Sequence, residues 1–396
     1  MKSFLVYLIL LIQVVLLFAQ QKQLFNINVA RTTDSQETLE AVQQLILDNY
    51  YSDELTKDDL NWAAIAGMLR HISPPESPEL GKLWTDEEYE KILNSLKGVK
   101  VTMGFKSSFN SNDGSLTVTS INEGSKAEKS LAINDRILRI DDQSLVGKSI
   151  AEVNELLDGE LNQSSTLKVV RDISIFEVSL KRDPLKVENL IVTEIPNRQA
   201  VLIELKKVTL GMSTDLAKEL ALLKEKGISN IVLDVRNNTG GVLNEGVNIS
   251  RLFMKKNDIV LRTQSRSKGV SNYVSDIDQF HDFNIAVLIN ENTASAAEII
   301  SSALKDHNRG ILVGKKTYGK GVIETTFTLE NEYRVKFITS AMYSPKGVSW
   351  QAKGLLPDYF VDQTQGNYSK VMKMEINDRI RSDLHLSTAL NLLKGE

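Results

Sequence analysis

Three short apolar runs in the second half of the chain constrain its fold most strongly. They cover residues 201–205, 230–234 and 285–289. Apolar runs of this length, bounded by turn residues, are typical of strands that are buried on both faces of a parallel sheet. The last two runs each lead into a turn of small residues and then into a helical pattern. This alternation predicts an α/β core, in which functional sites gather at the carboxyl ends of the strands.

The rest of the chain divides by pattern. Apolar residues at three- and four-residue spacing predict a helical segment over residues 36–98, which a proline-rich stretch at 74–78 interrupts. Short alternating strands and one amphipathic helix predict a compact module over residues 99–183. The α/β core then covers residues 184–362, and residues 363–396 form a helical tail. A length of 396 residues fits two or three domains.

The first 20 residues predict export. Lys2 precedes a run at 4–19 that is apolar except for Gln13. This run fits a signal peptide with cleavage after Ala19, but the bulky Leu17 two residues earlier also allows an uncleaved membrane anchor. A buried helix of the fold is the third interpretation. Either targeting interpretation locates the body in the periplasm or on the outer face of the membrane.

The composition excludes several classes of function. The chain has no cysteine, which rules out disulfides, thiol catalysis and cysteine metal sites. Its four histidines form no cluster, so we expect no metal site. The formal net charge of -4 provides no basic field for binding nucleic acid.

Ser295 is the first candidate for a catalytic residue. In the segment 289–299 an apolar strand ends, small residues form a turn and a helix begins near Ala294. A serine at a helix N-terminus meets free N–H groups and a favourable dipole, which suits a nucleophile that attacks a carbonyl group. Its neighbours Ala294, Ala296 and Ala297 leave room for a substrate backbone. The alternative is ordinary helix capping, for which serine is a preferred residue.

Lys320 lies in a second notable segment. Residues 314–321 read Gly-Lys-Lys-Thr-Tyr-Gly-Lys-Gly, which nearly matches the phosphate-binding loop, but Gly321 stands where that loop needs a hydroxyl group. A solvated basic loop is an alternative interpretation. A third is that Lys320 is a general base, because a buried lysine can lose its proton and then deprotonate a serine.

A glycine pair follows the buried strand that ends near residue 234. Residues 234–241 read Asp-Val-Arg-Asn-Asn-Thr-Gly-Gly. Gly240 and Gly241 can direct backbone N–H groups at an oxyanion, or can simply form a turn.

Together these segments resemble the carboxy-terminal processing (tail-specific) serine proteases. The resemblance also includes Thr-Ala-Ser-Ala-Ala-Glu at 293–298, Ala-Leu-Lys-Asp-His-Asn-Arg at 303–309 and Thr-Tyr-Gly-Lys-Gly-Val-Ile-Glu at 317–324. The order of these motifs and the 25 residues from Ser295 to Lys320 both match the family. Weaker similarities occur at 63–69 and 354–358, so the resemblance covers about residues 36–362.

The resemblance assigns roles to individual residues. It implies that Ser295 is the nucleophile and Lys320 the general base, and that N–H groups of Ala296 and of Gly240 or Gly241 form the oxyanion hole. Asp306 matches an acidic position near the dyad, although a carboxylate at a helix end explains it equally well. Glu324 stands where the family has a glutamine that helps to orient the lysine, and a carboxylate there would favour the charged form of the lysine.

The family fold is a ClpP/crotonase-like core with an inserted PDZ domain. Met103, Gly104 and Phe105 would then lie in the loop that accepts a terminal carboxylate, with the peptide added as an edge strand. Asn134 replaces a glycine of the family, and it can adopt positive φ. Residues 73–77 depart from the Pro-His-Ser pattern of the family.

The implied function is a serine endopeptidase that needs no cofactor. Its partners would be proteins or peptides with accessible C-termini, which it would cleave near those ends. Whether the chain forms a homo-oligomer is left open by the resemblance. A rival function is a catalytically silent scaffold that binds protein tails, to which Glu324 lends support. Another is an acyl-binding or hydratase-like enzyme with a related core, against which the PDZ-like module argues.

Overall fold

The computed structural model describes residues 35–75, 77–196 and 198–393, and the chain divides into two compact units, 1–71 and 72–396. The predicted leader over residues 1–20 lies outside the described residues. Among the residues that are described, no helix is both long and apolar enough to cross a membrane.

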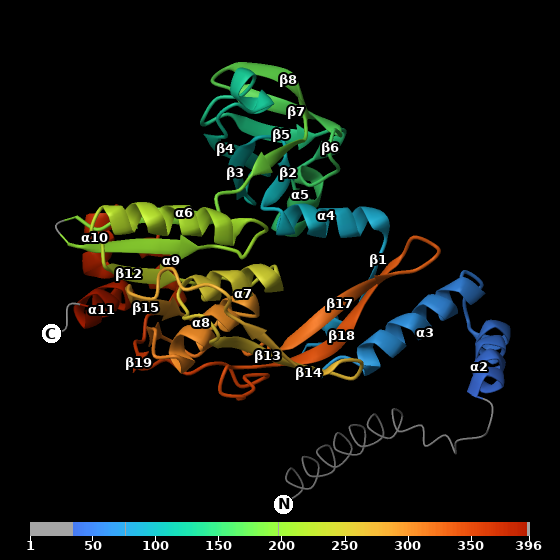
Figure 1. Ribbon diagram of the computed structural model, residues 1–396. Coiled ribbons are helices and arrows are strands. Elements are labelled where there is room, and N and C mark those ends of the chain that lie inside the picture. The colour runs from blue at the N-terminus through green and yellow to red at the C-terminus, as the bar shows by residue number, and fades with distance from the viewer. Residues whose placement is uncertain (1–34, 76, 197, 394–396) are drawn as a thin grey trace, which may run out of the picture. The chain divides into compact units, whose positions relative to one another are not determined.

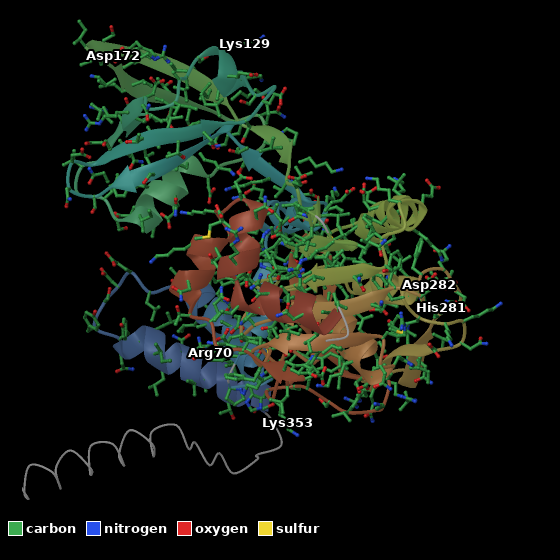
Figure 2. The ribbon with its side chains drawn as sticks, turned by 90° about the vertical axis from the view of Figure 1, so that its left-hand side faces the viewer. Arg70, Lys129, Asp172, His281, Asp282 and Lys353 are labelled. Atoms are coloured by element: carbon green, nitrogen blue, oxygen red, sulfur yellow. The ribbon has the colours of Figure 1, made fainter. Side chains whose placement is uncertain are left out.

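The described part of the first unit contains two helices, α2 (Ser35–Asn49) and α3 (Lys57–His71). The amide of Gln43 donates a hydrogen bond to Asn61 and links them (2.9 Å). Helix α3 has acidic residues in its first turn and the exposed Arg70 in its last, as the helix dipole favours (Figure 2). The predicted helical segment 36–98 is not continuous, because a short 3₁₀ turn and the strand β1 (Lys82–Trp84) precede the next helix, α4 (Asp86–Leu96).

A strand-rich body follows α4. Its sheet has the order β3-β4-β5-β7-β8, with β6 paired to β5, and β3 forms one edge. The apolar side chains of this sheet and of α5 close a separate core, while charged residues such as Lys129 and Asp172 are exposed on its surface (Figure 2). Asn134 has a φ of 74°, which confirms that it takes the positive φ expected of it. The elements are β3 (Phe105–Asn110), β4 (Ser115–Ile121), β5 (Arg136–Ile140), β6 (Gln143–Ser144), α5 (Ile150–Leu157), β7 (Ser164–Arg171) and β8 (Ser174–Lys181).

The entry and exit of this body are joined by a two-stranded sheet. Strand β2 (Val99–Thr102) pairs antiparallel with β9 (Asp183–Lys186). The chain therefore enters and leaves the body at the same place, as expected for an inserted module.

The predicted α/β core is a six-stranded sheet with the order β10-β11-β12-β15-β16-β19 (Figure 1). Only β10 is antiparallel to its neighbour. The strands are β10 (Leu190–Glu194), β11 (Ala200–Leu205), β12 (Asn230–Asp234), β15 (Asn284–Ile289), β16 (Gly310–Gly314) and β19 (Tyr359–Phe360). The helices α6 (Met212–Glu225), α7 (Leu243–Leu252) and α8 (Ala296–Asp306) occur between these strands in sequence.

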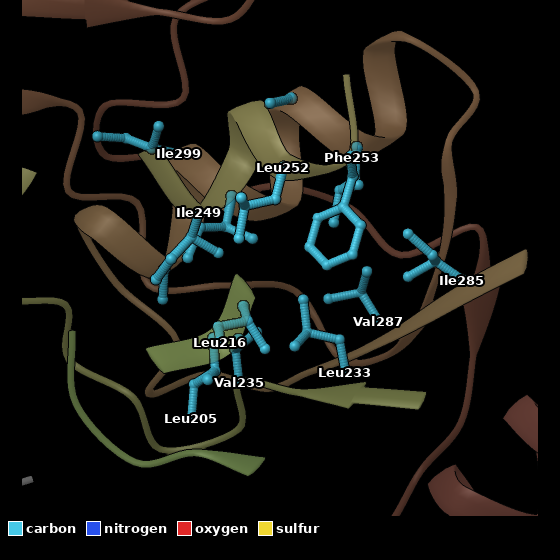
Figure 3. Packing of buried hydrophobic residues seen from close by; sticks show 14 of the residues in the cluster. Leu205, Leu216, Leu233, Val235, Ile249, Leu252, Phe253, Ile285, Val287 and Ile299 are labelled. Carbon is cyan, nitrogen blue, oxygen red and sulfur yellow. The ribbon is translucent and has the colours of Figure 1, made fainter. Parts of the chain in front are cut away.

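Alternate residues of the central strands are buried on opposite faces of this sheet. Leu233, Ile285 and Val287 join a core with Leu216, Ile249 and other residues of the helices (Figure 3). Val232, Ala286 and Leu288 point to a second core, which also contains Leu386 and Leu390. Burial on both faces explains why these strands read as unbroken apolar runs.

The predicted tail is part of this second core. Its helices are α9 (Gln365–Val371), α10 (Ile376–Ser382) and α11 (Leu384–Leu393). The fully buried Arg236 binds Asp234, which ends β12, and Asp383, which precedes α11 (2.7 Å to each). The C-terminal helices therefore hold the turn that follows β12.

A second, antiparallel sheet has the order β1-β18-β13-β14, with β17 also paired to β18. Strands β17 (Val322–Thr328) and β18 (Arg334–Tyr343) form a long hairpin, orange in Figure 1. The other strands are β13 (Ile259–Ser265) and β14 (Gly269–Val274). Because β17 begins directly after Gly321, this sheet carries the segment that contains Lys320.

Candidate active site

Ser295 lies in the turn between β15 and α8, immediately before the first residue of the helix. Its backbone has φ 56° and ψ −118°. Ordinary N-cap residues of this chain are extended, as in Thr85 (φ −71°, ψ 166°) and Ser149 (φ −74°, ψ 162°). Ser295 thus occupies a cap position in a strained conformation that capping does not require. A strained serine in a sharp strand-to-helix turn is the arrangement that presents a nucleophilic hydroxyl group.

The buried carboxylate of Glu298 holds Ser295 and Lys320 together. Its Oε2 accepts hydrogen bonds from the backbone N–H groups of Ser295 (2.9 Å) and Lys320 (2.9 Å). Its Oε1 accepts from the hydroxyl of Thr317 (2.6 Å) and the N–H of Gly319 (2.8 Å). Backbone N–H groups from two segments that are distant in sequence therefore bind the same oxygen atom. The two backbone nitrogens lie within two hydrogen-bond lengths of each other. Burial raises the pKa of Glu298, and the four donors oppose that rise.

The loop that carries Lys320 packs closely on a neighbouring turn. A Cβ at Gly319 would stand 2.7 Å from the nitrogen of Gly354, and one at Gly321 would stand 2.7 Å from the nitrogen of Gln351. The indole N–H of Trp350 donates to the carbonyl of Lys320 (3.0 Å). The phosphate-loop interpretation is wrong, because strand β17 follows Gly321 where that loop would need a helix. The solvated-loop interpretation is also wrong, because the backbone of this loop donates a hydrogen bond to Glu298 and accepts one from Trp350.

The side chain of Lys320 forms an ion pair. Its Nζ lies 2.8 Å from Oε2 of Glu324, and the side chain is 23% exposed. The other carboxylate oxygen of Glu324 binds Nζ of Lys336 at 2.9 Å. Burial raises the pKa of Glu324, but the two lysines outweigh it, so the pKa of Glu324 falls below its ordinary value. Glu324 is therefore a carboxylate that Lys320 shares with a second lysine.

The glycine turn after β12 contacts the Ser295 turn directly. Gly240 has a φ of 93°, and a Cβ there would stand 2.7 Å from Ser295 Cβ and 2.8 Å from the nitrogen of Ala296. The N–H of Gly240 already donates to the side chain of Asn238 (2.9 Å). Within the described residues, no acceptor is found for the N–H of Gly241 or of Ala296. Of the two glycines, Gly241 rather than Gly240 therefore has an N–H without an acceptor among the described residues.

Asp306 lies at the opposite end of α8 from Ser295. Its Oδ2 accepts hydrogen bonds from the hydroxyl of Ser344 (2.5 Å) and the N–H of Lys346 (3.0 Å). Asp306 is the eleventh and last residue of the helix that Ser295 precedes, so the two lie about 16 Å apart at the helical rise. The structure does not bring Asp306 to the dyad, and the helix-end interpretation describes it correctly.

The predicted tail-binding residues lie where the chain enters β3, the edge strand of the strand-rich body, which begins at Phe105. Met103 and Phe105 are buried in its core, and Gly104, with a φ of 92°, turns the chain into β3. A groove of about 360 Å³ lies between β3 and α5, and Ile150 and Leu157 contribute to its lining. An edge strand beside a helix-lined groove can accept an extended peptide.

Two residues that contribute to this site, Glu298 and Lys336, were not identified from the sequence. Glu298 stands three residues after Ser295, a spacing typical of a helix cap, and that pattern gave no sign that it also reaches Lys320. Lys336 lies opposite Thr326 across the hairpin, diagonal to Glu324. The register of β17 and β18 brings it to the site, and nothing local to Lys336 indicates that register.

Comparisons with known proteins identify relatives of both the α/β core and the strand-rich body. Residues 199–361 match Peptidase family S41, and residues 117–171 match the PDZ domain. A probable CtpA-like serine protease of Staphylococcus aureus is 30% identical over 328 residues, which are 82% of this chain and 64% of that protein. The corresponding protein of Staphylococcus saprophyticus is 27% identical over 83% of this chain and 66% of its own length. The chain thus spans just under two thirds of these relatives.

Two solved structures share the fold. The photosystem II D1 C-terminal processing protease is 21% identical with a TM-score of 0.52, covering 90% of this chain and 98% of its own. A putative S41 protease from Bacteroides fragilis is 15% identical with a TM-score of 0.56, covering 90% and 97%. These matches confirm the resemblance inferred from the motifs, and they confirm the predicted fold class: an S41 peptidase core with a PDZ domain and an N-terminal helical segment.

Proposed function

We propose that this chain, which carries a Peptidase family S41 domain and a PDZ domain, is a serine endopeptidase with a Ser295–Lys320 dyad. The observation that carries the proposal is the shared contact of Glu298 Oε2, which binds the backbone of both residues. A strained serine held beside a half-buried lysine needs neither histidine nor metal for acyl transfer.

The proposed reaction proceeds in two stages. Oγ of Ser295 attacks the carbonyl carbon of a peptide bond while its proton passes to the neutral Nζ of Lys320. The N–H groups of Ala296 and Gly241 stabilise the resulting oxyanion. The C–N bond then breaks, Lys320 protonates the leaving amine, and an ester remains on Ser295. Water, deprotonated by Lys320, hydrolyses that ester and frees both residues.

The PDZ domain is proposed to select substrates by their carboxyl terminus. The groove between β3 and α5 offers an open strand edge for the last residues of a substrate chain. Met103 and Gly104 lead into that strand, which begins at Phe105, and these three residues would receive the terminal carboxylate. The partners are therefore proteins or peptides with accessible C-termini.

We also propose that the protein acts outside the cytoplasm. The apolar run at residues 4–19 after Lys2 supports export, by a cleaved signal or a retained anchor.

The ion pair of Lys320 favours one rival function, a catalytically silent PDZ scaffold. A lysine that stays protonated on Glu324 cannot accept the proton of Ser295. Such a scaffold would bind protein tails and cleave nothing.

A cleavage assay separates the two functions. One unfolded protein is offered with a free or an amidated C-terminus, well below saturation, to the intact chain and to Ser295→Ala. The proposal predicts cleavage that Ser295→Ala abolishes and that amidation slows. Tail binding without cleavage would favour the scaffold, and equal rates for the two ends would show that the PDZ domain does not read the tail.

A further inference from the structure

The carboxylate of Glu324 binds two lysines, one on each oxygen. Lys320 contacts Oε2 at 2.8 Å, and Lys336 contacts Oε1 at 2.9 Å. The side chain of Glu324 is only 12% exposed, so water screens these charges weakly. The three side chains therefore form one linked cluster of charges.

A lone ion pair with Glu324 would prevent Lys320 from acting as a base. A general base must be unprotonated, and a buried carboxylate at 2.8 Å strongly favours the protonated form of an amine. The second lysine, Lys336, changes the net charge of the cluster. When Lys320 and Lys336 are both protonated, the three groups carry a net charge of +1. When Lys320 loses its proton, Glu324 and Lys336 remain as a neutral pair.

Lys336 has a second favourable contact besides Glu324. Its Nζ lies 5.2 Å from the centroid of the Trp84 ring, and Trp84 is buried. The face of an aromatic ring stabilises a cation, and more strongly where water is excluded. Lys336 thus has both a carboxylate and an aromatic face, whereas Glu324 is the only charged partner in contact with Nζ of Lys320 among the described residues.

Other charged groups surround this cluster from each packed element. Glu298 of α8 accepts the backbone N–H of Lys320. Lys82 of β1 lies opposite Lys336 and adds a second positive charge near Trp84, with its Nζ 6.0 Å from the ring centroid. Arg334 of β18 pairs with Asp86 of α4 at 2.8 Å. The arginine charge is therefore balanced by a neighbouring carboxylate.

We propose that Lys336 is a positioning residue for the catalytic base: by neutralising Glu324 and holding it in place, it lets Lys320 lose its proton and accept that of Ser295. The proposal rests on the dyad function proposed above. It explains how a glutamate can stand beside a lysine base, because the Glu324–Lys336 pair presents Lys320 with a neutral acceptor.

The test compares pH profiles of kcat/KM for the intact chain and four variants. Lys336→Met removes the charge, Lys336→Arg keeps it, Glu324→Gln removes the carboxylate, and Glu324→Gln/Lys336→Met removes both. Lys226→Met is the matched control, since it removes the same net charge from an ion pair with Glu194 outside the site.

Lys336→Met is expected to move the midpoint of the ascending limb of the profile by about one unit towards higher pH. At pH values below that midpoint, kcat/KM should fall about tenfold. Lys336→Arg and Lys226→Met should keep the original midpoint. In the Glu324→Gln background, Lys336→Met should cause a smaller alkaline shift, because only the direct repulsion between the two ammonium groups is then removed. A rate loss that is equal in both backgrounds and independent of pH would overturn the proposal.

A second readout does not depend on proteolysis. In Ser295→Ala protein, the reaction of Lys320 with an amine-acetylating reagent is followed against pH by peptide mass spectrometry. Adding Lys336→Met should move the onset of labelling to higher pH, and an unchanged onset would contradict the proposal. If Ser295→Ala does not impair cleavage, the proposed function fails, while the labelling result still decides whether Lys336 acts on Lys320.

Discussion

Gly240 lies directly against Ser295: a Cβ at Gly240 would stand 2.7 Å from the Cβ of the serine. The same Cβ would also meet the nitrogen of Ala296, whose N–H is a proposed oxyanion donor, at 2.8 Å. The glycine turn after β12 therefore packs against both the proposed nucleophile and a proposed oxyanion donor.

Gly240→Ala is expected to lower kcat about a hundredfold, because the new methyl group must displace Ser295 or Ala296. Gly227→Ala is the matched control. Gly227 also has a positive φ (73°), so it pays a similar backbone strain of about 1 kcal/mol, but nothing lies within 4 Å of its Cβ position. Similar losses of activity in the two variants would mean that strain, and not contact with Ser295, is responsible.

Glu298→Gln tests the link between the two catalytic segments. A glutamine has one acceptor oxygen, so its amide group must face two of the four donors now bound by Glu298. We expect a loss of about 1–3 kcal/mol in the free energy of unfolding and at least about tenfold lower cleavage. Glu245→Gln provides a control, because Glu245 accepts one hydrogen bond, from the backbone N–H of Ser213 (2.9 Å). Wild-type activity in Glu298→Gln would show that the shared contact does not organise the dyad.

Asp306→Asn should retain most of the activity. The asparagine oxygen can still accept from Ser344 and Lys346, and the residue lies at the far end of α8 from Ser295. Asp306→Ala should lower the free energy of unfolding by about 1 kcal/mol through the lost hydrogen bonds, with little change in kcat. A large fall in kcat for folded Asp306→Asn would restore the assignment that the family resemblance implies.

The buried carboxylate of Asp234 should make the free energy of unfolding of the core sensitive to acid. It is buried; burial raises its pKa, but Arg236 and Arg379 outweigh this and hold the pKa below the ordinary value of 3.8. Because the folded pKa is depressed, the carboxylate stabilises the fold above the unfolded pKa, and this stability is lost as pH falls. Denaturant titrations between about pH 5 and pH 3 should show a steeper loss for the intact chain than for Asp234→Asn. Identical slopes would contradict this role.

Local patterns in the sequence predicted the core of the fold and the centre of the site. The strand–turn–helix around Ser295 is read from adjacent residues, and burial on both sheet faces makes β12 and β15 unmistakable. Long-range pairing could not be read in this way. The strand β1 becomes visible only through its partner β18, and Lys336 reaches Glu324 only through the register of the β17–β18 hairpin.

Motif position alone also proved insufficient for Asp306. The motif places it eleven residues after Ser295, but a straight helix carries it away from the site. Glu298 shows the opposite case: it was part of a recognised motif, yet its second role depends on a loop more than twenty residues later.

Covalent labelling tests the central claim, that Ser295 is a nucleophile activated by Lys320, most directly. The chain is treated with an organophosphonate that acylation-competent serines attack, and the modified peptide is identified by mass spectrometry. The account predicts one adduct, on Ser295, which is absent in Ser295→Ala and forms at least about a hundredfold more slowly in folded Lys320→Ala. An adduct on another residue, or labelling of Lys320→Ala at the rate of the intact chain, would contradict it.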